Sequence, residues 1–401
     1  MKKNLQRVLL FAFLVMAAAL VAARMSFFGL LPALSRSVPA AETPAPSAEL
    51  REEELAPAPT AEPTPEPTPE PTPEPTPEPT PELFTFSYIG DLTLTSHQHT
   101  EDFARKMDGD TSYPLSNVAD YFKNDEYTIG NLECSFSDKS LYSEQTFYFR
   151  APSYYADILT DGGVDFVTTA NNHTDDFGDA GRQDTWAALE ERRIPFGKND
   201  EAQIVETPHG LRLGIYCQFD WSFHPNLDKA LAAIEQLKAD GADYIICAFH
   251  WGVELHYRPE QADINIAHAC IDAGADMIYG THAHVLQPIE EYNGGIILYS
   301  MGNFCFGGNT APSDPDTAIV QVTMQRDVDG TVSHLGYTII PCCVSSVPVL
   351  TGQTGDGYND YRPTPYVEGG EDYARALSKI DGSYEGANGE ANYEKWHESH
   401  G

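Results

Sequence analysis

Two histidines separated by a single residue, His282 and His284, follow a short apolar run at residues 276–279. Residues two apart on an extended segment point the same way, so both imidazoles are expected to face one bound cation. Four upstream apolar runs, each of which predicts a strand, also end in polar side chains. Their candidate residues are Asp91, Glu133, Asn172 with His173, and His250.

Together these side chains describe a site for one or two divalent metal ions, with Mn, Fe or Zn as candidates, because the ligand set mixes oxygen and nitrogen. Two cations about 3.5–4 Å apart lower the pKa of a water between them and clamp both oxygens of a displacement. Either Glu133 or Asp91 would bridge such a pair. His173 would donate a proton to a leaving group.

Each residue taken alone also has a structural interpretation. Asp91 follows a glycine and is typical of a turn cap, and Glu133 alone is typical of a surface residue. A single buried histidine such as His250 is more often a core residue with its hydrogen bonds satisfied. The metal hypothesis therefore depends on five strand ends meeting in one place.

The elements that would position these residues alternate between strands and helices. Strands are predicted at residues 83–89, 127–130, 164–169, 211–219, 244–249 and 276–279, and helices at 114–122, 152–160, 179–192, 227–239 and 259–273. Hairpin-like strands are then predicted at 289–292, 296–299, 318–325 and 332–340. This order predicts a layered α/β sandwich, whose sites lie at strand ends.

The chain of 401 residues carries a formal net charge of −36. A surface this acidic argues against nucleic acid as a partner, because phosphate binding requires a basic surface. The seven cysteines have no CxxC spacing and several lie in apolar runs, so they are predicted to be buried small hydrophobes. The adjacent pair Cys342 and Cys343 has no evident physical role.

The amino terminus predicts export. Basic residues precede an apolar run of 16 residues at 8–23, within a signal-anchor or export segment placed at residues 1–41. An uncleaved helix would give a single-pass membrane protein with an extracytoplasmic domain, and cleavage would give a secreted one. Residues 42–82 repeat Glu-Pro-Thr-Pro and predict a polyproline II linker, with a disordered tail as the alternative. The folded domain is placed at 83–341 and a loosely packed extension at 342–401.

The segments that carry the candidate ligands also resemble a known family. Gly90-Asp91, Asn131-Leu132-Glu133, Asn171-Asn172-His173, His250-Trp251-Gly252, Gly280-Thr281-His282-Ala283-His284 and Tyr299 to Phe304 occur in the order of the CapA family of capsule and poly-γ-glutamate synthesis proteins. The resemblance covers about residues 84–340. It implies a metallophosphoesterase-like αββα sandwich and agrees with a membrane anchor outside the cell.

The resemblance also implies roles for individual residues. Asp91, Glu133 and His284 would hold one metal, while Glu133, Asn172, His250 and His282 would hold the second. His173 would be the acid. The chain departs from the phosphoesterase pattern in having Thr93 where a histidine is usual and Glu133 where aspartate is usual. His97 and His99 lie nearby but are expected to be surface residues.

Three functions follow as expectations. The first is a CapA-like protein that acts in synthesis, export or attachment of poly-γ-glutamate or a related anionic capsule polymer, with membrane synthase subunits as possible partners. The second is a metal-dependent phosphoesterase or γ-glutamyl amidase. The third is a polymer-binding subunit with a decayed site. Arg150, Arg182, Arg192 and Arg193 are candidates for polymer contact, and Trp251, Glu254 and Tyr257 for the pocket lining.

Overall fold

The computed structural model describes residues 80–96, 101–139 and 147–385. The predicted export segment and most of the predicted linker lie outside these residues, as do His97 and His99. No helix within the described ranges is both long enough and apolar enough to cross a membrane.

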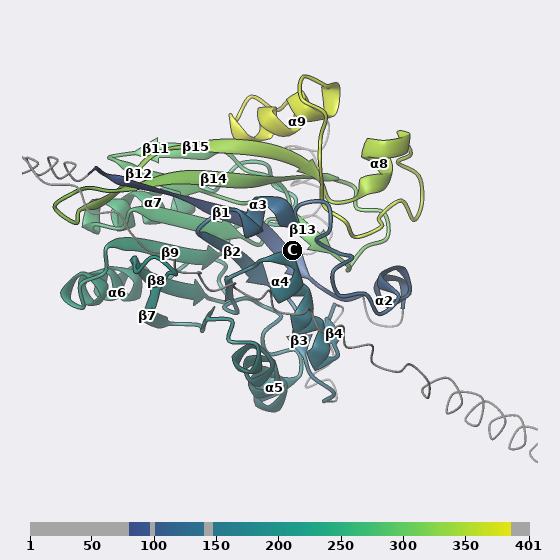
Figure 1. The fold of residues 1–401 in the computed structure, drawn as a ribbon, viewed down its shortest axis with the longest axis horizontal. Coiled ribbons are helices and arrows are strands. Elements are labelled where there is room, and N and C mark those ends of the chain that lie inside the picture. The colour runs from purple at the N-terminus through teal and green to yellow at the C-terminus, as the bar shows by residue number, and fades with distance from the viewer. Residues whose placement is uncertain (1–79, 97–100, 140–146, 386–401) are drawn as a thin grey trace, which may run out of the picture. The chain divides into compact units, whose positions relative to one another are not determined.

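Two sheets make up most of the described chain (Figure 1). The first sheet has the order β16 (Thr364–Pro365), β15 (Val332–Cys343), β14 (Asp316–Arg326), β1 (Glu82–Thr93), β2 (Tyr127–Leu132), β5 (Phe166–Thr168) and β6 (Phe196–Gly197), and β13 (Asn303–Phe306) also pairs with β1. The second has the order β11 (Ile289–Tyr292), β12 (Gly295–Leu298), β10 (Met277–Thr281), β9 (Tyr244–His250), β8 (Arg212–Phe219) and β7 (Glu201–Glu206). A separate pair joins β3 (Ser135–Phe136) to β4 (Arg150–Ala151).

The strands that lead to the candidate ligands run parallel to their neighbours. In the first sheet β1, β2 and β5 are parallel, and in the second β8, β9 and β10 are parallel. The antiparallel strands lie outside these central runs. Parallel strands deliver their carboxyl ends to one edge of a sheet, which is where the candidate ligands lie.

The two sheets face each other across a shared core. The Tyr88 ring of β1 lies 5.9 Å from the Tyr279 ring of β10, and the Tyr279 hydroxyl donates to the Ile89 carbonyl at 2.6 Å. The outer face of the second sheet packs against α6 (Leu227–Ala239) and α7 (Gln261–Ala273). The first sheet is covered by α2 (Asp102–Met107), α3 (Ala119–Lys123), the 3-10 turn η1 (Ser153–Ala156), α4 (Asp157–Gly162) and α5 (Gly178–Glu191). The predicted mixed α/β fold is therefore confirmed.

Several elements differ from the predictions. The predicted helix at 114–122 is reduced to α3, preceded by turns. The hairpins expected after residue 288 are divided between the sheets, because β11 and β12 extend the second sheet while β14 and β15 extend the first. The predicted burial of all seven cysteines is confirmed.

The segment after residue 341 also differs from its prediction as a loosely packed extension. β15 continues to Cys343, and α8 (Ser346–Thr351) and α9 (Glu371–Ile380) follow. Figure 1 shows α9 beside β15, where Ala376 and Ile380 enter the core between the sheets. The Lys379 ammonium is buried and bonds both oxygens of Asp314, at 2.7 and 2.8 Å, and one oxygen of Asp316, at 2.6 Å. The segment is rich in polar residues, so its sequence gives no sign of these buried contacts.

Candidate metal centre

The first sheet bends where Asp91 enters the site. β1 does not end at Gly90-Asp91 as predicted but continues to Thr93, with a register shift beside Asp91. The Asp91 amide donates to the Gly302 carbonyl at 2.9 Å. A Cβ at position 90 would lie 1.9 Å from that same carbonyl oxygen, so only glycine permits this close approach.

The segment with the two close histidines is not extended, contrary to the prediction. β10 ends at Thr281, and both His282 (φ 96°) and His284 (φ 57°) have positive φ angles. Their rings are 5.9 Å apart and inclined by 51°. Non-glycine residues rarely adopt such backbone angles, and they concentrate at functional sites. The two imidazoles therefore serve different parts of the centre.

One group of ligand atoms converges around His250. Its Nε2 atom lies 2.8 Å from the Asn172 Oδ1, 3.2 Å from the His282 Nδ1 and 3.5 Å from the Glu133 Oε1. Glu133, His250 and His282 meet the distance criterion for holding one cation, and all three are buried. This is the set expected for the second metal.

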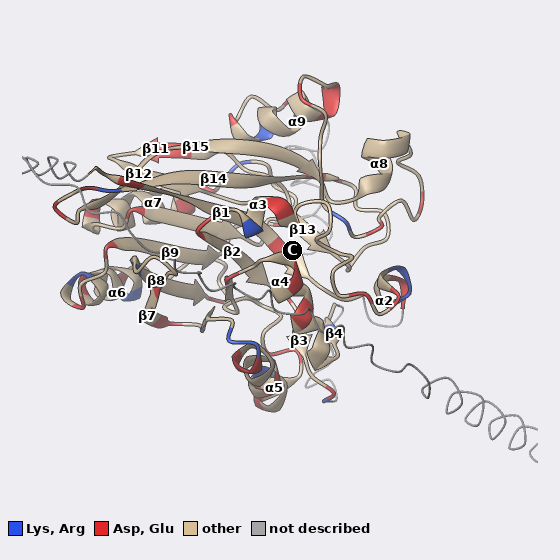
Figure 2. Cartoon of the chain, viewed as in Figure 1, with Lys and Arg blue, Asp and Glu red and all other residues tan. Residues whose placement is uncertain are grey.

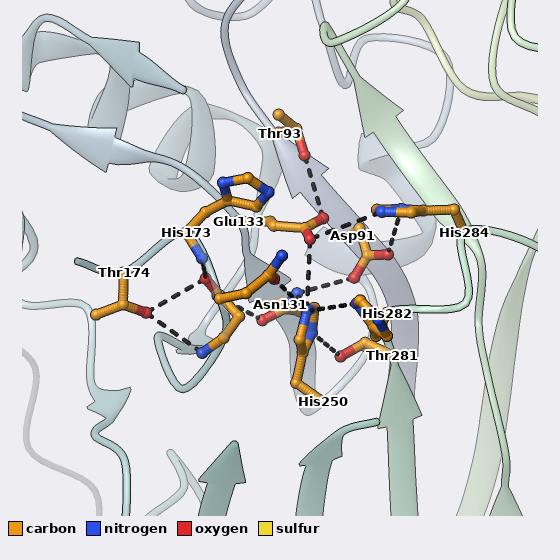
Figure 3. Close-up of polar contacts among 12 residues, drawn as sticks. Asp91, Thr93, Asn131, Glu133, His173, Thr174, His250, Thr281, His282 and His284 are labelled. Atoms are coloured by element: carbon orange, nitrogen blue, oxygen red, sulfur yellow. Dashed lines mark hydrogen bonds and ion pairs between the residues drawn. The ribbon is translucent and has the colours of Figure 1, made fainter. Parts of the chain in front are cut away.

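A second group shares Glu133. The His284 Nδ1 lies 3.3 Å from the Asp91 Oδ2, and the His284 Nε2 lies 3.9 Å from the Glu133 Oε1. Asp91, Glu133 and His284 also lie close enough to hold a cation. Figure 3 shows Glu133 between His284 and His250, so Glu133 joins the two groups, as expected of a bridging ligand.

Two carboxylate oxygens at the centre lack the partners that burial requires. Neither the Asp91 Oδ2 nor the Glu133 Oε1 accepts a hydrogen bond, although both residues are fully buried. Such an atom costs about 1–3 kcal/mol when left unsatisfied, and more when it is charged. A cation would satisfy both oxygens, so the residues present fit a divalent metal.

Burial and neighbouring charges shift the proton affinities of the centre. Burial and the nearby Asp91 raise the pKa of Glu133 well above its usual range. Burial and neighbouring histidines lower the pKa of both His250 and His282 well below the usual value. These two imidazoles are therefore neutral at physiological pH, which is the state that binds metal.

His284 behaves differently because it faces carboxylates. Burial lowers its pKa, but Glu133 and Asp91 outweigh that effect and raise it to about 10. Without a cation, His284 would therefore carry a proton and partly neutralise the two acids. Binding of a cation would displace that proton.

The departure at Thr93 leaves the Asp91 side of the centre with fewer ligands. Thr93 is buried, and its hydroxyl donates to the Glu133 Oε2 at 3.4 Å, so it orients the shared carboxylate. A threonine hydroxyl is a poorer ligand than the histidine of the phosphoesterase pattern. The Asp91 group therefore offers three candidate ligands, whereas the His250 group offers four with Asn172.

His173 stands at the edge of the centre. Its Nδ1 atom lies 3.0 Å from the Asp176 Oδ2, and its ring packs edge-on against Phe149 at 4.6 Å. A carboxylate on one imidazole nitrogen fixes the ring and its tautomer. The other nitrogen is then the one that exchanges protons with a bound molecule.

Three side-chain amides and one hydroxyl support the ligands, and none of these four residues is among the predicted site residues. Asn131 donates to the Asp91 Oδ1 at 2.8 Å, and Asn171 donates to the Asn131 Oδ1 at 3.0 Å. Asn303 lies with its Oδ1 2.9 Å from the His284 Nδ1, and the Thr281 hydroxyl lies 2.9 Å from the His250 Nδ1. All four residues belong to the segments that carry the family resemblance, but their spacing gave no sign of their partners.

A cavity of about 660 Å³ opens beside the centre. Asn172, His173, His284 and Asn303 line it together with the ring of Phe306. Glu254 lines the same cavity, as expected. Trp251 is buried and donates to the Tyr299 carbonyl at 2.8 Å, so it supports the centre from within the core. Tyr257 lines a different cavity, beside Lys379.

Three of the four arginines proposed for polymer contact have partners within the protein. Arg182 pairs with Asp175 and Asp179 and lines a second cavity beside Asn172. Arg192 pairs with Asp157, and Arg150 packs over the Phe177 ring. Figure 2 shows acidic and basic residues spread over the described elements.

Comparison with known proteins places this centre in a family. The family model described as bacterial capsule synthesis protein PGA_cap matches residues 85–308, more than half of the chain. The chain belongs to this family. All seven predicted site residues lie within the matched range, and the predicted resemblance to CapA proteins is confirmed.

Individual relatives agree with this assignment. The capsule biosynthesis protein CapA of Bacillus anthracis is 30% identical over 266 residues, which are 60% of this chain and 64% of the relative. The PGA biosynthesis protein CapA of Bacillus subtilis is 26% identical over 271 residues, 62% of this chain and 70% of the relative. A probable polyglutamine synthesis accessory protein of Mycobacterium tuberculosis is 32% identical over 165 residues, 33% of this chain and 43% of the relative. The match thus spans less than two thirds of the B. anthracis protein.

Among solved structures, the NAD nucleotidase of Haemophilus influenzae aligns with a TM-score of 0.39 and 12% identity. The alignment covers 76% of this chain and 56% of that one. At this TM-score the likeness carries no argument about fold or activity.

Proposed function

We propose that this member of the capsule synthesis family is a metal-dependent hydrolase or transferase that acts on poly-γ-glutamate or a related anionic capsule polymer. The observation that carries this proposal is the pair of buried oxygens, Asp91 Oδ2 and Glu133 Oε1, which face histidine nitrogens and accept no hydrogen bond. Buried polar atoms are paired in most protein cores, and these two oxygens lie together within one cluster of candidate ligands.

Glu133, Asn172, His250 and His282 would hold one cation, and Asp91, Glu133 and His284 the other. Bound divalent metal supplies a water of lowered pKa and positive charge that stabilises a developing oxyanion. His173, held at Nδ1 by Asp176, protonates the departing group from Nε2. The Phe149 ring beside His173 restricts access of water to that proton.

The cellular role follows from the family. Relatives named for capsule and PGA biosynthesis support a part in making, exporting or attaching the polymer, together with membrane synthase subunits. The apolar run at residues 8–23 supports anchoring, with the domain outside the cytoplasm. The reaction would then be cleavage or transfer at a γ-glutamyl amide, with a phosphoester as the alternative substrate.

A non-catalytic, polymer-binding role is the second candidate, and Thr93 favours it. Without a histidine at this position the Asp91 group has few ligands, so the centre would hold one cation firmly and the other weakly or not at all. One cation without its partner would lack the two-metal clamp on the attacking and leaving oxygens, but would still order the residues around it.

The metal content of the purified protein tests both candidates. We expect close to two equivalents of Mn, Fe or Zn by elemental analysis of the full chain, and a loss of both in Glu133→Gln, since Glu133 is shared. His282→Ala should lose the cation bound by the His250 group while keeping part of the cation bound by the Asp91 group. The exposed His209, which lies outside the centre, provides the matched control as His209→Ala.

Two equivalents that disappear in Glu133→Gln, together with release of product from γ-glutamyl or phosphoester substrates, would support the enzyme. One equivalent without turnover would favour the binding role. A folded, unsubstituted protein that binds no metal would rule out both the two-cation and the one-cation centre.

A further inference from the structure

The ligand His282 is held differently from the other two candidate histidine ligands. A hydrogen-bond partner on the second ring nitrogen usually fixes the orientation of a metal-binding histidine. The His250 ring has this support from the Thr281 hydroxyl, and the His284 ring has it from the Asn303 side chain. Within the described ranges, His282 has one side-chain hydrogen bond, between its Nδ1 and the His250 Nε2, which faces the centre. The orientation of the His282 ring therefore depends on another contact.

That contact is an aromatic stack with Phe223. The Phe223 ring is half-buried, lies 4.6 Å from the His282 ring and is inclined to it by only 14°. The rings of His250 and His284 lie at 4.7 and 5.9 Å from the His282 ring but are inclined to it by 57° and 51°. Stacking of two nearly parallel rings at this distance favours one orientation of the imidazole.

The backbone of Phe223 has an uncommon conformation that its neighbours hold in place. Its φ angle is 56°, and a bulky residue with a positive φ is an outlier. Such strain persists only where the surrounding structure determines the conformation. The Phe223 amide donates to the Asp220 carbonyl at 2.8 Å, and the Phe223 carbonyl accepts from the Gly252 amide at 3.0 Å. Because Gly252 lies two residues after His250, this second bond ties Phe223 to the end of the ligand-bearing strand β9.

A second attachment of the same loop lies one residue further along the chain, at His224. The loop spans residues 220–226, between β8 and α6. The His224 Nδ1 lies 2.9 Å from the Asp263 Oδ1, and the His224 Nε2 lies 3.4 Å from the Glu260 Oε2. Asp263 is buried in the first turn of α7, and Glu260 directly precedes that helix. The loop is therefore joined both to α7 and to the end of β9.

We propose that Phe223 is a positioning residue for the metal centre, and that the loop at residues 220–226 holds its ring against His282. With the rings stacked, the His282 Nδ1 stays directed at the cation position of the His250 group. Without the stack, the imidazole would turn among several orientations, and the cation would lose one of its four candidate ligands for part of the time. The positioning role rests on the metal centre of the proposed function, whereas the stack is a property of the protein without metal.

Competition with a chelator for Zn²⁺, using the full chain and its variants, tests the role in metal binding. Phe223→Leu keeps an apolar side chain but removes the stack, so it should weaken the binding of one cation by about 10–100-fold, as other residues that orient a metal ligand do when replaced. Phe223→Tyr keeps a flat ring and should retain the affinity of the unsubstituted protein. Phe84→Leu is the matched control, because Phe84 is also a partly buried ring that packs on the same core and lies beside a histidine, His209.

Histidine-ring NMR of the metal-free chain provides a signature that a loss of packing elsewhere would not produce. The ring current of Phe223 should shift the signals of the His282 ring protons, which are identified by their absence in His282→Ala. Phe223→Leu should abolish this shift and Phe223→Tyr should keep it. His224→Leu, which removes both contacts with α7, should reduce the shift and the Zn²⁺ affinity in part, because the loop would hold the Phe223 ring less firmly.

A Phe223→Leu variant that binds Zn²⁺ as tightly as Phe84→Leu does would overturn the proposal, as would a loss of affinity without a change in the His282 signals. Equal losses in Phe223→Tyr and Phe223→Leu would also overturn it, because the position would then require something other than a flat ring. An unsubstituted protein that shows the ring shift but binds no Zn²⁺ would contradict the proposed function and leave the stack in place. One that binds Zn²⁺ without the ring shift would contradict the stack alone.

Discussion

At the scale of single residues, His173 is set apart from the candidate metal ligands. Asp91, Glu133 and His284 form a buried group of two acids and one base. His250 and His282 are held neutral by burial. His173 stands apart, with its own carboxylate partner.

Replacing His173 should therefore affect turnover without affecting metal. We expect His173→Gln to lower kcat by about a hundredfold or more, the usual contribution of a general acid. The loss should be small with an activated aryl ester, whose leaving group needs no proton. Steady-state kinetics on activated and unactivated substrates, with metal analysis, would check this.

Asp176→Asn is the companion variant, since it keeps the imidazole but weakens its orientation, and it should give a smaller loss. Equal losses on both kinds of substrate, or release of metal from His173→Gln, would show that His173 has another role.

Asp276 gives the protein a pH-dependent stability. Burial raises its pKa to about 6, against the opposing effects of the Ile245 amide, which donates to it at 2.7 Å, and of Lys238. The folded state thus binds this proton more tightly than the unfolded state does. The stabilisation is present at low pH and lost as pH rises through about 6. Asp276→Asn should remove a decline of about 2–3 kcal/mol in unfolding free energy between about pH 4 and 7.

Urea unfolding of the parent and of Asp276→Asn across this range measures the difference directly. Other buried carboxyls, including Asp165, affect both proteins equally. A constant difference between the two proteins at every pH would contradict the assignment to Asp276.

The types of the six candidate ligands could be predicted from the sequence because each lies at the end of an apolar strand. Their partners could not. Asn131, Asn171 and Asn303 contact the centre through bonds between residues 19 to 40 positions apart, and strand register alone sets those pairs. The positive φ angles of His282 and His284 also leave no mark on the sequence, since neither residue is glycine.

At the scale of elements, the centre depends on close approach of backbones. β1 approaches the residue before its parallel neighbour β13 at Gly90 and Gly302, and β10 meets the segment after β12 at Gly280, where a Cβ would lie 2.0 Å from the Tyr299 carbonyl oxygen. These contacts bring together strand ends that are far apart in the chain.

Gly90→Ala should disrupt the close approach between Gly90 and Gly302. The new methyl group would clash with the Gly302 carbonyl oxygen. The backbone cannot move away without breaking the hydrogen bond from the Asp91 amide to that oxygen. We expect a loss of about 3 kcal/mol in unfolding free energy, near the upper range for overpacking, and weaker metal binding. Thermal unfolding with and without metal would measure both.

Gly355→Ala is the matched control, because no atom lies within 4 Å of a Cβ built there. A Gly90→Ala variant as stable as Gly355→Ala would show that the close approach at Gly90 does not require glycine.

Elements with a clear apolar pattern could be predicted, and several short or polar ones could not. α6 spans the predicted residues, and β8 and β9 differ from prediction by one residue. β13, β16 and the β3–β4 pair have two to four residues each, too few for a periodic pattern. β7 has six residues but is largely polar and only partly buried, so it shows no apolar run.

At the scale of the whole described chain, the last helix holds a wall of the first cavity. Lys379 of α9 bonds Asp314, which lines both that cavity and the one beside Tyr257. Lys379 lies beyond the range of the family match. The folded unit therefore extends past that range.

Lys379→Met should destabilise the protein by about 3–5 kcal/mol, because it leaves two buried carboxylates with less compensation. Arg375 still bonds Asp316, which limits the loss. Lys123→Met, at an exposed position of α3, should change stability by about 0.5 kcal/mol or less. Guanidinium unfolding would compare them, and equal midpoints would show that the buried ion pairs contribute nothing net.

The division of the ligands between the sheets has a mechanical consequence. Glu133 and Asn172 follow strands of the first sheet, whereas His250 and His282 belong to β9 and the end of β10 in the second. A cation held by all four residues would link the two sheets, since separating the sheets would require breaking bonds between the cation and its ligands. The domain would then resist forces that pull the two sheets apart better with a cation bound than without one. Removal of metal would then loosen the sandwich at its ligand-bearing edge before the rest of the fold gives way.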